Sequence, residues 1–279
     1  MDGMSDRGRS PGPADHRHED RSGGDVAPER SVAVRPATMP VPPVDAAPTG
    51  ADLVAAEWLF GDRLSLAVTY AELLIGDGVL RGLIGPREAP RIWERHLLNC
   101  VVVAEIIPRN ARVIDVGSGA GLPGVVLAVA RPDLSVVLLE PLARRAAFLT
   151  EVVAALGLDQ TTVVRGRAEE WVQGGRDDRA GIATARALAP LDRLVAWCLP
   201  LVVEGGSVLA LKGESATEEV ATHRDVIARL GGGTPAVRRC GVGVIEPPTT
   251  VIEIVRERAV RTGAPAGPRR TRGRPRSPA

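Results

Sequence analysis

Long uncharged apolar runs are missing from this sequence of 279 residues. Without a run of about 18 such residues, no transmembrane helix is expected, and residues 1–49 lack the apolar stretch of a secretory signal. Cysteine is also scarce, because Cys100, Cys198 and Cys240 are the only three. Their wide spacing and odd number match neither a disulfide framework nor a zinc pattern. We therefore expect a cytoplasmic protein that holds no metal.

Lysine is rarer still: of the 35 lysine and arginine residues, Lys212 alone is a lysine. The formal net charge of +1 points to no particular partner. Two explanations of Lys212 stay open. A genome rich in G and C replaces lysine codons by arginine codons, so that one lysine survives by chance. Alternatively, position 212 requires a compact ammonium group that a guanidinium cannot replace.

Both ends of the chain differ in composition from its middle. Proline, glycine and charged residues fill residues 1–49, which predicts a disordered segment. Residues 259–279 mix arginine with proline and glycine, which predicts a disordered basic tail. That tail is either a non-specific RNA tether that neutralises phosphates or an incidental solvated end. Between them we expect one folded domain, residues 50–258, whose first part, residues 50–110, is helical.

The remainder of this domain, residues 111–258, alternates predicted strands and helices. Short apolar runs predict parallel strands at 112–115, 135–140, 161–165, 181–185 and 207–211. Helical spacing predicts helices between and after them at 122–130, 142–156, 168–172, 191–203 and 217–230. Two final strands, 237–245 and 249–255, are expected as an antiparallel pair. The alternation predicts an α/β fold with a mainly parallel seven-stranded sheet covered by helices on both faces.

A glycine-rich loop joins the first predicted strand to the helix that follows it. Gly119, Gly121 and Gly124 match the G-x-G-x-x-G spacing of a dinucleotide-binding loop. Asp115 followed by Gly117, Gly119 and Gly121 matches the loop of a methyltransferase instead. A carboxylate repels the pyrophosphate of a dinucleotide and attracts the ammonium and sulfonium of S-adenosylmethionine. The sequence therefore favours S-adenosylmethionine, and an NAD(P)-dependent oxidoreductase remains the alternative.

Further polar residues follow the other predicted strands, where ligands of such sheets bind. Glu140 ends the second strand, where a carboxylate accepts from ribose hydroxyls in both cofactor classes. Glu169 follows the third strand, either near an adenine or at an exposed helix start. Arg186 and Lys212 follow the fourth and fifth strands, and two cations at one cleft indicate an anionic substrate. An ion pair between Arg186 and a core carboxylate is the alternative.

The methyl acceptor is predicted by exclusion. Residues 184–190 lack the Asn/Asp-Pro-Pro-aromatic motif that orients an exocyclic amine. The three cysteines lie in apolar surroundings, which favours structural roles over a nucleophile for carbon-5 of a pyrimidine. Arginine beside a cleft is the commonest partner of phosphate or of a guanine edge. His96, taken alone, lies on an amphipathic helix face, where a lone histidine is usually structural. The pair Arg144 and Arg145, taken alone, is typical of a solvated, charged helix face.

Several motifs together resemble the RsmG (GidB) family over residues 51–257. The carriers are Trp93 to Cys100, the loop from Asp115 to Gly124, Glu140 with the arginines and Phe148-Leu149 that follow, and the segments 185–187 and 211–213. They occur in the same order in that family. Asn99-Cys100 departs from it, since many members have Asp-Ser there.

The resemblance implies a Rossmann-like class I methyltransferase that uses S-adenosylmethionine to methylate guanine N7 in the 530 loop of 16S rRNA. The expected partner is 16S rRNA or a small-subunit precursor, and the protein is expected to be a monomer without a membrane partner. A non-catalytic rRNA-binding assembly factor is the other alternative. The expected catalytic residues are Arg186 and Lys212. The expected cofactor-binding residues are Asp115, Gly117, Ser118, Gly119, Gly121, Leu122, Glu140, Ala168, Glu169 and Arg186. The expected RNA contacts are Arg95, His96, Arg144, Arg145 and Lys212.

Overall fold

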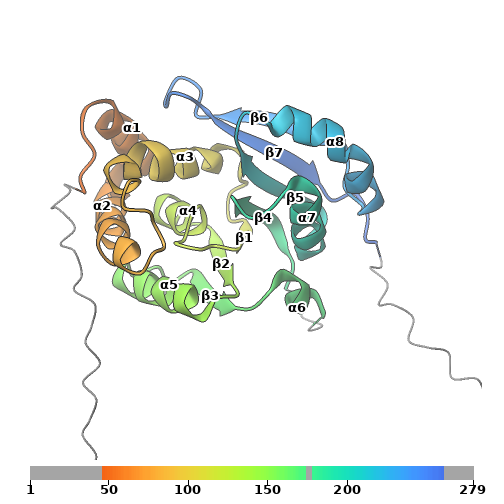
Figure 1. Ribbon diagram of the computed structural model, residues 1–279, viewed down its shortest axis with the longest axis horizontal. Coiled ribbons are helices and arrows are strands. Elements are labelled where there is room, and N and C mark those ends of the chain that lie inside the picture. The colour runs from red at the N-terminus through yellow and green to blue at the C-terminus, as the bar shows by residue number, and fades with distance from the viewer. Residues whose placement is uncertain (1–45, 174–177, 261–279) are drawn as a thin grey trace, which may run out of the picture. The chain divides into compact units, whose positions relative to one another are not determined.

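The computed structural model describes residues 46–173 and 178–260 (Figure 1). The chain divides into two units, Met1–Met39 and Pro40–Ala279, and every described residue belongs to the second. The predictions of disorder for residues 1–45 and 261–279 therefore lie outside the described residues. None of the helices in the described part is long and apolar enough to cross a membrane.

Seven strands form one sheet in the order β3-β2-β1-β4-β5-β7-β6. The pairs from β3 to β5 are parallel, whereas β7 runs antiparallel to both β5 and β6. This confirms the predicted, mainly parallel seven-stranded sheet. The strands are β1 Arg112–Val116, β2 Ser135–Glu140, β3 Thr161–Arg165, β4 Ala180–Arg186, β5 Val202–Lys212, β6 Ala236–Cys240 and β7 Thr249–Val255.

Alternating side chains explain why helices cover both faces of the sheet. In β5, Leu209 and Leu211 belong to one apolar cluster, and Val208 and Ala210 belong to the other. Successive strand residues point to opposite faces, so each face buries its own apolar set. Figure 1 shows α4 and α5 on one side of the sheet and α7 and α8 on the other. The helices after β1 are α4 Gly124–Ala130, α5 Ala143–Ala155, α6 Ala168–Gln173, α7 Leu191–Cys198 and α8 Ala216–Arg229.

The predicted helical extension packs on the same side as α4. Its helices are α1 Gly50–Phe60, α2 Leu64–Leu73 and α3 Leu98–Val101, and all three contact α4. Residues 92–106 of the extension are a succession of a π-helix (η4, Ile92–Leu97), α3 and a 3-10 helix (η5, Val102–Ile106). The extension thus packs on α4, the helix that follows the glycine loop.

Three predicted element boundaries were wrong by five residues, and one of them is the start of β5, which lies at Val202 and not at 207. The helix expected to reach 203 ends at Cys198, because Pro200 lacks an N–H and forms a 3-10 turn before β5 begins at Val202. The strand expected over 237–245 ends at Cys240. The Gly241 N–H donates to Glu105 Oε2 at 3.1 Å instead of to a neighbouring strand, and the chain then turns back toward β7.

The folded domain also extends beyond its predicted limits. Ala46 and Pro48 are buried, and the Trp93 indole N–H donates to the Ala46 carbonyl at 2.7 Å. The prediction of disorder is therefore wrong for residues 46–49, because a buried indole needs this acceptor. At the other end, the Ala259 N–H donates to Glu204 Oε1 at 2.8 Å, which places the start of the predicted tail against the domain.

Candidate functional site

The glycine loop between β1 and α4 has one face that is open to a ligand. A Cβ on Gly121, whose φ is +103°, would lie 2.5 Å from Val125 Cγ2 and 2.7 Å from the Tyr70 hydroxyl oxygen. A Cβ on Gly119, whose φ is +59°, would meet only the Gly117 carbonyl oxygen, at 3.8 Å. Gly121 therefore packs inward, whereas Gly119 offers bare backbone, as close binding of a cofactor requires.

Glu140 brings a carboxylate beside this open position. It ends β2 and is 1% exposed. Its Oε2 accepts from the Gly119 N–H at 2.9 Å, and its Oε1 accepts from the Leu142 N–H at 3.0 Å. Each carboxylate oxygen has a second acceptor direction left. The predicted contact of Glu140 with the ribose of a cofactor stays a prediction.

Asp115 lies beneath the loop instead of on its open side. Its carboxylate is 0% exposed, with Oδ2 accepting from the Gly124 N–H at 3.1 Å and Oδ1 from the Thr184 hydroxyl at 3.1 Å. Burial raises the pKa of this carboxyl group to about 6, although its hydrogen bonds oppose the shift. Asp115 thus ties the loop to α4 and β4, and its attraction for a bound cation acts through the loop.

The remaining predicted cofactor residues surround the same end of the sheet. Ser118 is buried and donates to the Asp115 carbonyl at 2.9 Å, while Leu122 is half-buried. Ala168 begins α6 after β3 and packs in the apolar cluster of the second sheet face. Glu169 follows it and is exposed. Their contacts with a cofactor stay predictions.

Sequence reasoning missed Tyr70, the only tyrosine in the chain. It belongs to α2 and is 1% exposed, and its hydroxyl donates to the Ala120 carbonyl of the glycine loop at 2.7 Å. Burial raises its pKa well above the usual range, so the hydroxyl remains a donor. The helical extension therefore contributes directly to the shape of the cofactor loop.

Tyr70→Phe is expected to loosen the loop while keeping the ring packing. The variant leaves the buried Ala120 carbonyl without its donor, which costs roughly 1–3 kcal/mol. We expect a lower melting temperature and weaker binding of S-adenosylmethionine, measured by thermal melting and calorimetry. Phe60→Leu, a core substitution in α1, is the control that lowers stability without touching the loop. Unchanged cofactor affinity in Tyr70→Phe would contradict the assignment.

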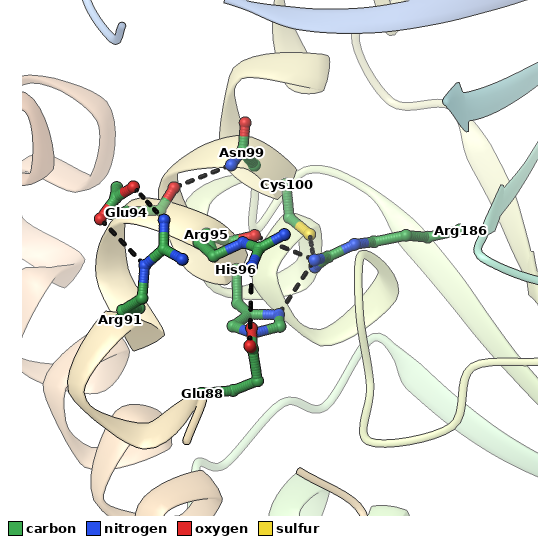
Figure 2. A network of polar contacts seen from close by, with 8 residues as sticks. All are labelled: Glu88, Arg91, Glu94, Arg95, His96, Asn99, Cys100 and Arg186. Carbon is green, nitrogen blue, oxygen red and sulfur yellow. Dashed lines mark hydrogen bonds and ion pairs between the residues drawn. The ribbon is translucent and has the colours of Figure 1, made fainter. Parts of the chain in front are cut away.

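Arg186 ends β4 and reaches across to the helical extension (Figure 2). Its Nη1 donates to Cys100 Sγ at 3.2 Å. Its Nη2 donates to the Arg95 carbonyl at 2.9 Å and to His96 Nδ1 at 2.9 Å. These three acceptors are uncharged. Within residues 46–173 and 178–260, no carboxylate pairs with Arg186, so the predicted alternative of a core ion pair is not found there.

His96 faces Arg186 and Glu88 instead of solvent. Its side chain is 12% exposed, and its Nε2 lies 3.1 Å from Glu88 Oε2. Burial, reinforced by the charge of Arg186, lowers its pKa to about 4, although Glu88 opposes the shift. The imidazole is therefore neutral near pH 7. Its predicted contact with RNA stays a prediction, and both of its ring nitrogens already have partners.

A cleft of about 1070 Å³ opens beside Arg186. Its walls come from α1, the η4–α3 helix, the ends of β4 and β5 and the segment that leads into β7. The basic residues along it are Arg91, Arg95, Arg186, Lys212 and Arg239. The acidic ones are Asp52, Glu94, Glu214 and Glu246. The cleft therefore meets the carboxyl ends of β4 and β5 at Arg186 and Lys212.

Lys212 lines this cleft, but its ammonium already has two acceptors. Its Nζ donates to the Ala189 carbonyl at 3.0 Å and to Glu219 Oε2 at 2.7 Å, and its side chain is 12% exposed. The ammonium thus links β5 to α8 and to the segment after β4. This geometry supplies a physical reason for a compact cation at position 212. Glu219 neutralises its charge.

Arg144 and Arg145 lie apart from the other predicted RNA contacts. They occupy the first turn of α5, where Arg144 is exposed and Arg145 is half-buried. Neither lines the cleft, whereas Arg95, Arg186 and Lys212 do. Of the five predicted RNA contacts, Arg95 and Lys212 therefore line the cleft, whereas His96, Arg144 and Arg145 do not.

The three cysteines are buried and unpaired. Burial raises the pKa of each thiol, to about 12 for Cys240. Such thiols carry little thiolate at neutral pH. Their environment agrees with the structural roles expected from the sequence.

Comparison with known proteins tests the interpretation of this site. The chain matches the family GidB, described as rRNA small subunit methyltransferase G, over residues 63–243. It belongs to this family. Relatives named "Ribosomal RNA small subunit methyltransferase G" include one from Salinispora arenicola, 65% identical over 235 residues that cover 83% of this chain and 97% of that protein. Another, from Thermobifida fusca, is 56% identical over 221 residues, 79% of this chain and 92% of that protein.

Membership of the GidB family confirms the resemblance found in the sequence. The chain has a Rossmann-like class I methyltransferase fold, and it is an S-adenosylmethionine-dependent methyltransferase. The dinucleotide interpretation of the glycine loop, and with it the NAD(P)-dependent oxidoreductase, is therefore wrong. The second alternative, a non-catalytic assembly factor, is not favoured either, because the family and its relatives are named as methyltransferases.

Proposed function

We propose that this GidB-family protein transfers a methyl group from S-adenosylmethionine to N7 of a guanine in the 530 loop of 16S rRNA. The observation that carries the proposal is the name shared by relatives up to 65% identical, which specifies the RNA of the small ribosomal subunit. The substrate is 16S rRNA or a small-subunit precursor that contains it, and the protein acts as a monomer. The contacts of Arg186 and the residues along the cleft indicate which kind of acceptor atom the site suits.

The protonation states around Arg186 support an acceptor that needs no general base. Guanine N7 has an in-plane lone pair and no proton to lose. Among the residues that the structure describes, His96 is the histidine beside Arg186, and its two nitrogens are engaged by Arg186 and Glu88. An amine or hydroxyl acceptor would require a proton acceptor in this place. The arrangement therefore suits N7, for which orientation and proximity contribute most of the rate.

The role of Arg186 follows from where the positive charge goes during methyl transfer. Bound S-adenosylmethionine supplies a methyl group activated by a sulfonium, and the positive charge passes to the purine ring. A nearby guanidinium does not stabilise that developing charge. We infer that Arg186 binds an anionic or electron-rich group, such as an RNA phosphate or guanine O6, and leaves the N7 lone pair free. Gly119 and Glu140 would hold the cofactor on the other side of Arg186, over the loop that Asp115 ties down.

The proposal is tested with the full chain and RNA that lacks the modification. Naked 16S rRNA and small-subunit particles from a deletion strain are incubated with S-adenosylmethionine carrying a labelled methyl group. We expect 7-methylguanosine in the fragment that contains the 530 loop, identified by nuclease digestion and mass spectrometry. Glu140→Ala is the matched control, because it is expected to lose cofactor binding and therefore to transfer no label. Label at another position, or none on either substrate, would contradict the proposal.

A further inference from the structure

Three side chains from distant parts of the sequence form a row beside the cleft. Figure 2 shows His96 between Glu88 and Arg186. His96 lies on η4, Arg186 ends β4, and Glu88 directly precedes the short 3-10 turn Ala89–Arg91. The two contacts of the imidazole measure 2.9 Å to Arg186 Nη2 and 3.1 Å to Glu88 Oε2. The row thus links the extension to the end of the sheet.

The chemistry of the two partners determines where the proton of His96 lies. A guanidinium only donates hydrogen bonds, so Nδ1 must be the bare acceptor nitrogen. The neutral imidazole then carries its proton on Nε2, which donates to Glu88. Glu88 therefore selects the tautomer that Arg186 requires. The carboxylate acts on the arginine through the imidazole, without contacting it.

This arrangement orients Arg186 while keeping its charge available. A guanidinium has five N–H donors, and the contacts to Cys100, Arg95 and His96 use three of them. Both Nη2 protons are used, which prevents rotation of the group. The Nε–H and one Nη1–H remain for a ligand. A carboxylate in the place of His96 would orient the group equally well, but it would cancel the charge that attracts a phosphate.

A protonated His96 would destroy this arrangement, because it would present a donor and a positive charge to Arg186. The charged groups facing the imidazole are Arg186 from β4, Arg95 from η4 and Glu88 from the turn before it. The two arginines and burial oppose protonation, and Glu88 favours it. The balance keeps the imidazole neutral at physiological pH.

We propose that Glu88 and His96 are positioning residues which hold the Arg186 guanidinium in the cleft, oriented and uncompensated, to receive a phosphate or guanine O6 of the substrate RNA. His96 is thus neither a proton acceptor in the reaction nor a direct contact of the RNA. The inference rests on the proposed function only for the identity of the ligand that Arg186 receives. The orientation of Arg186 by His96 and Glu88 is independent of that ligand.

The first test follows the titration of His96 by NMR in the full chain. In the wild type, His96 is expected to stay neutral with its proton on Nε2 and to titrate near pH 4. Arg186→Met removes a cation and raises the His96 pKa, whereas Glu88→Gln removes the stabilising anion and lowers it. His223, on α8, is the internal reference and should not respond. A His96 pKa near 6.5 that neither variant changes would overturn the proposal.

The second test is a double-mutant cycle on binding of a 16S rRNA fragment. His96→Ala and Arg186→Met are each expected to weaken binding roughly 10-fold, because a charge-assisted hydrogen bond is affected in both. The double variant should bind no more weakly than Arg186→Met alone. His96→Asn should restore most of the affinity, because its Oδ1 provides an acceptor close to the position of Nδ1. Calorimetry should find the affinity for S-adenosylmethionine unchanged in the His96 variants.

The outcomes separate this proposal from the proposed function. Multiplicative losses in the cycle, or equal losses in His96→Ala and His96→Asn, mean that His96 does not act through Arg186. Thermal melting of each variant distinguishes a folding defect from such a result. If the His96 titration behaves as expected but no methyl group reaches 16S rRNA, the proposed function fails and the positioning of Arg186 by His96 and Glu88 stands.

Discussion

Gly119→Ala is expected to remove most of the cofactor affinity and leave the protein folded. The added methyl group meets no neighbour closer than the Gly117 carbonyl oxygen at 3.8 Å. Its cost to folding is the strain of a non-glycine residue at φ +59°, roughly 1–2 kcal/mol. The same methyl group occupies the open face where the cofactor approaches, and such overpacking weakens binding by about 10- to 100-fold. Calorimetry with S-adenosylmethionine and thermal melting measure the two effects separately.

Gly121→Ala is the matched control in the same loop. Its methyl group would lie 2.5 Å from Val125 Cγ2 and 2.7 Å from the Tyr70 hydroxyl oxygen. This variant is expected to lose folding stability, roughly 2–4 kcal/mol from strain and overpacking together. Gly119→Ala should therefore reduce mainly the cofactor affinity, and Gly121→Ala mainly the folding stability. If Gly119→Ala binds S-adenosylmethionine as tightly as the wild type, the open face of the loop is not the cofactor site.

Asp115→Asn is expected to change the pH dependence of stability and to weaken cofactor binding. The pKa of the buried carboxyl group is raised from 3.8 to about 6 in the folded protein. The folded state therefore binds this proton more tightly, so its stabilising effect is complete below about pH 4 and is lost as the pH rises through 6. Over that window the carboxyl group lowers the unfolding free energy by about 3 kcal/mol.

The experiment compares denaturant unfolding of the wild type and Asp115→Asn between about pH 4 and 7.5. Relative to the variant, the wild type should lose stability as the pH rises, because asparagine carries no charge to desolvate. Asparagine keeps an acceptor for Thr184 but loses the one for the Gly124 N–H. The loop is therefore held less firmly, and the cofactor affinity is lower at every pH. Parallel pH profiles for the two proteins would disprove the raised pKa.

Much of the sheet was predictable because its signals are local. The strands expected at 135–140 and 161–165 match β2 and β3 at both ends. Short apolar runs bounded by turn residues fix such strands without reference to the remainder of the chain. The glycine loop was equally visible, since its spacing follows from the backbone turn it makes. Placing Glu140 and Arg186 at one end of the sheet followed from parallel strands alone.

Two of the errors came from contacts that the local sequence does not contain. The end of β6 depends on Glu105, which accepts from the Gly241 N–H across 136 residues of sequence. The packed start of the domain depends on the Trp93 indole, which donates to the Ala46 carbonyl. Periodicity predicted a strand for residues 241–245, and composition predicted disorder for residues 46–49. Both predictions used only the residues of the segment itself. A distant partner changed each outcome.

The sequence by itself determined the alternation of strands and helices, the glycine loop that follows Asp115 and the resemblance to the GidB family. Only the tertiary structure decided which atoms the polar side chains meet. The partners of Arg186 are 86 to 91 residues away, and the hydroxyl of Tyr70 reaches a carbonyl 50 residues away. Hydrogen bonds act over about 3 Å and depend on angle. Residue type and spacing specify which groups need a partner, whereas the packed fold alone brings a particular partner within that distance.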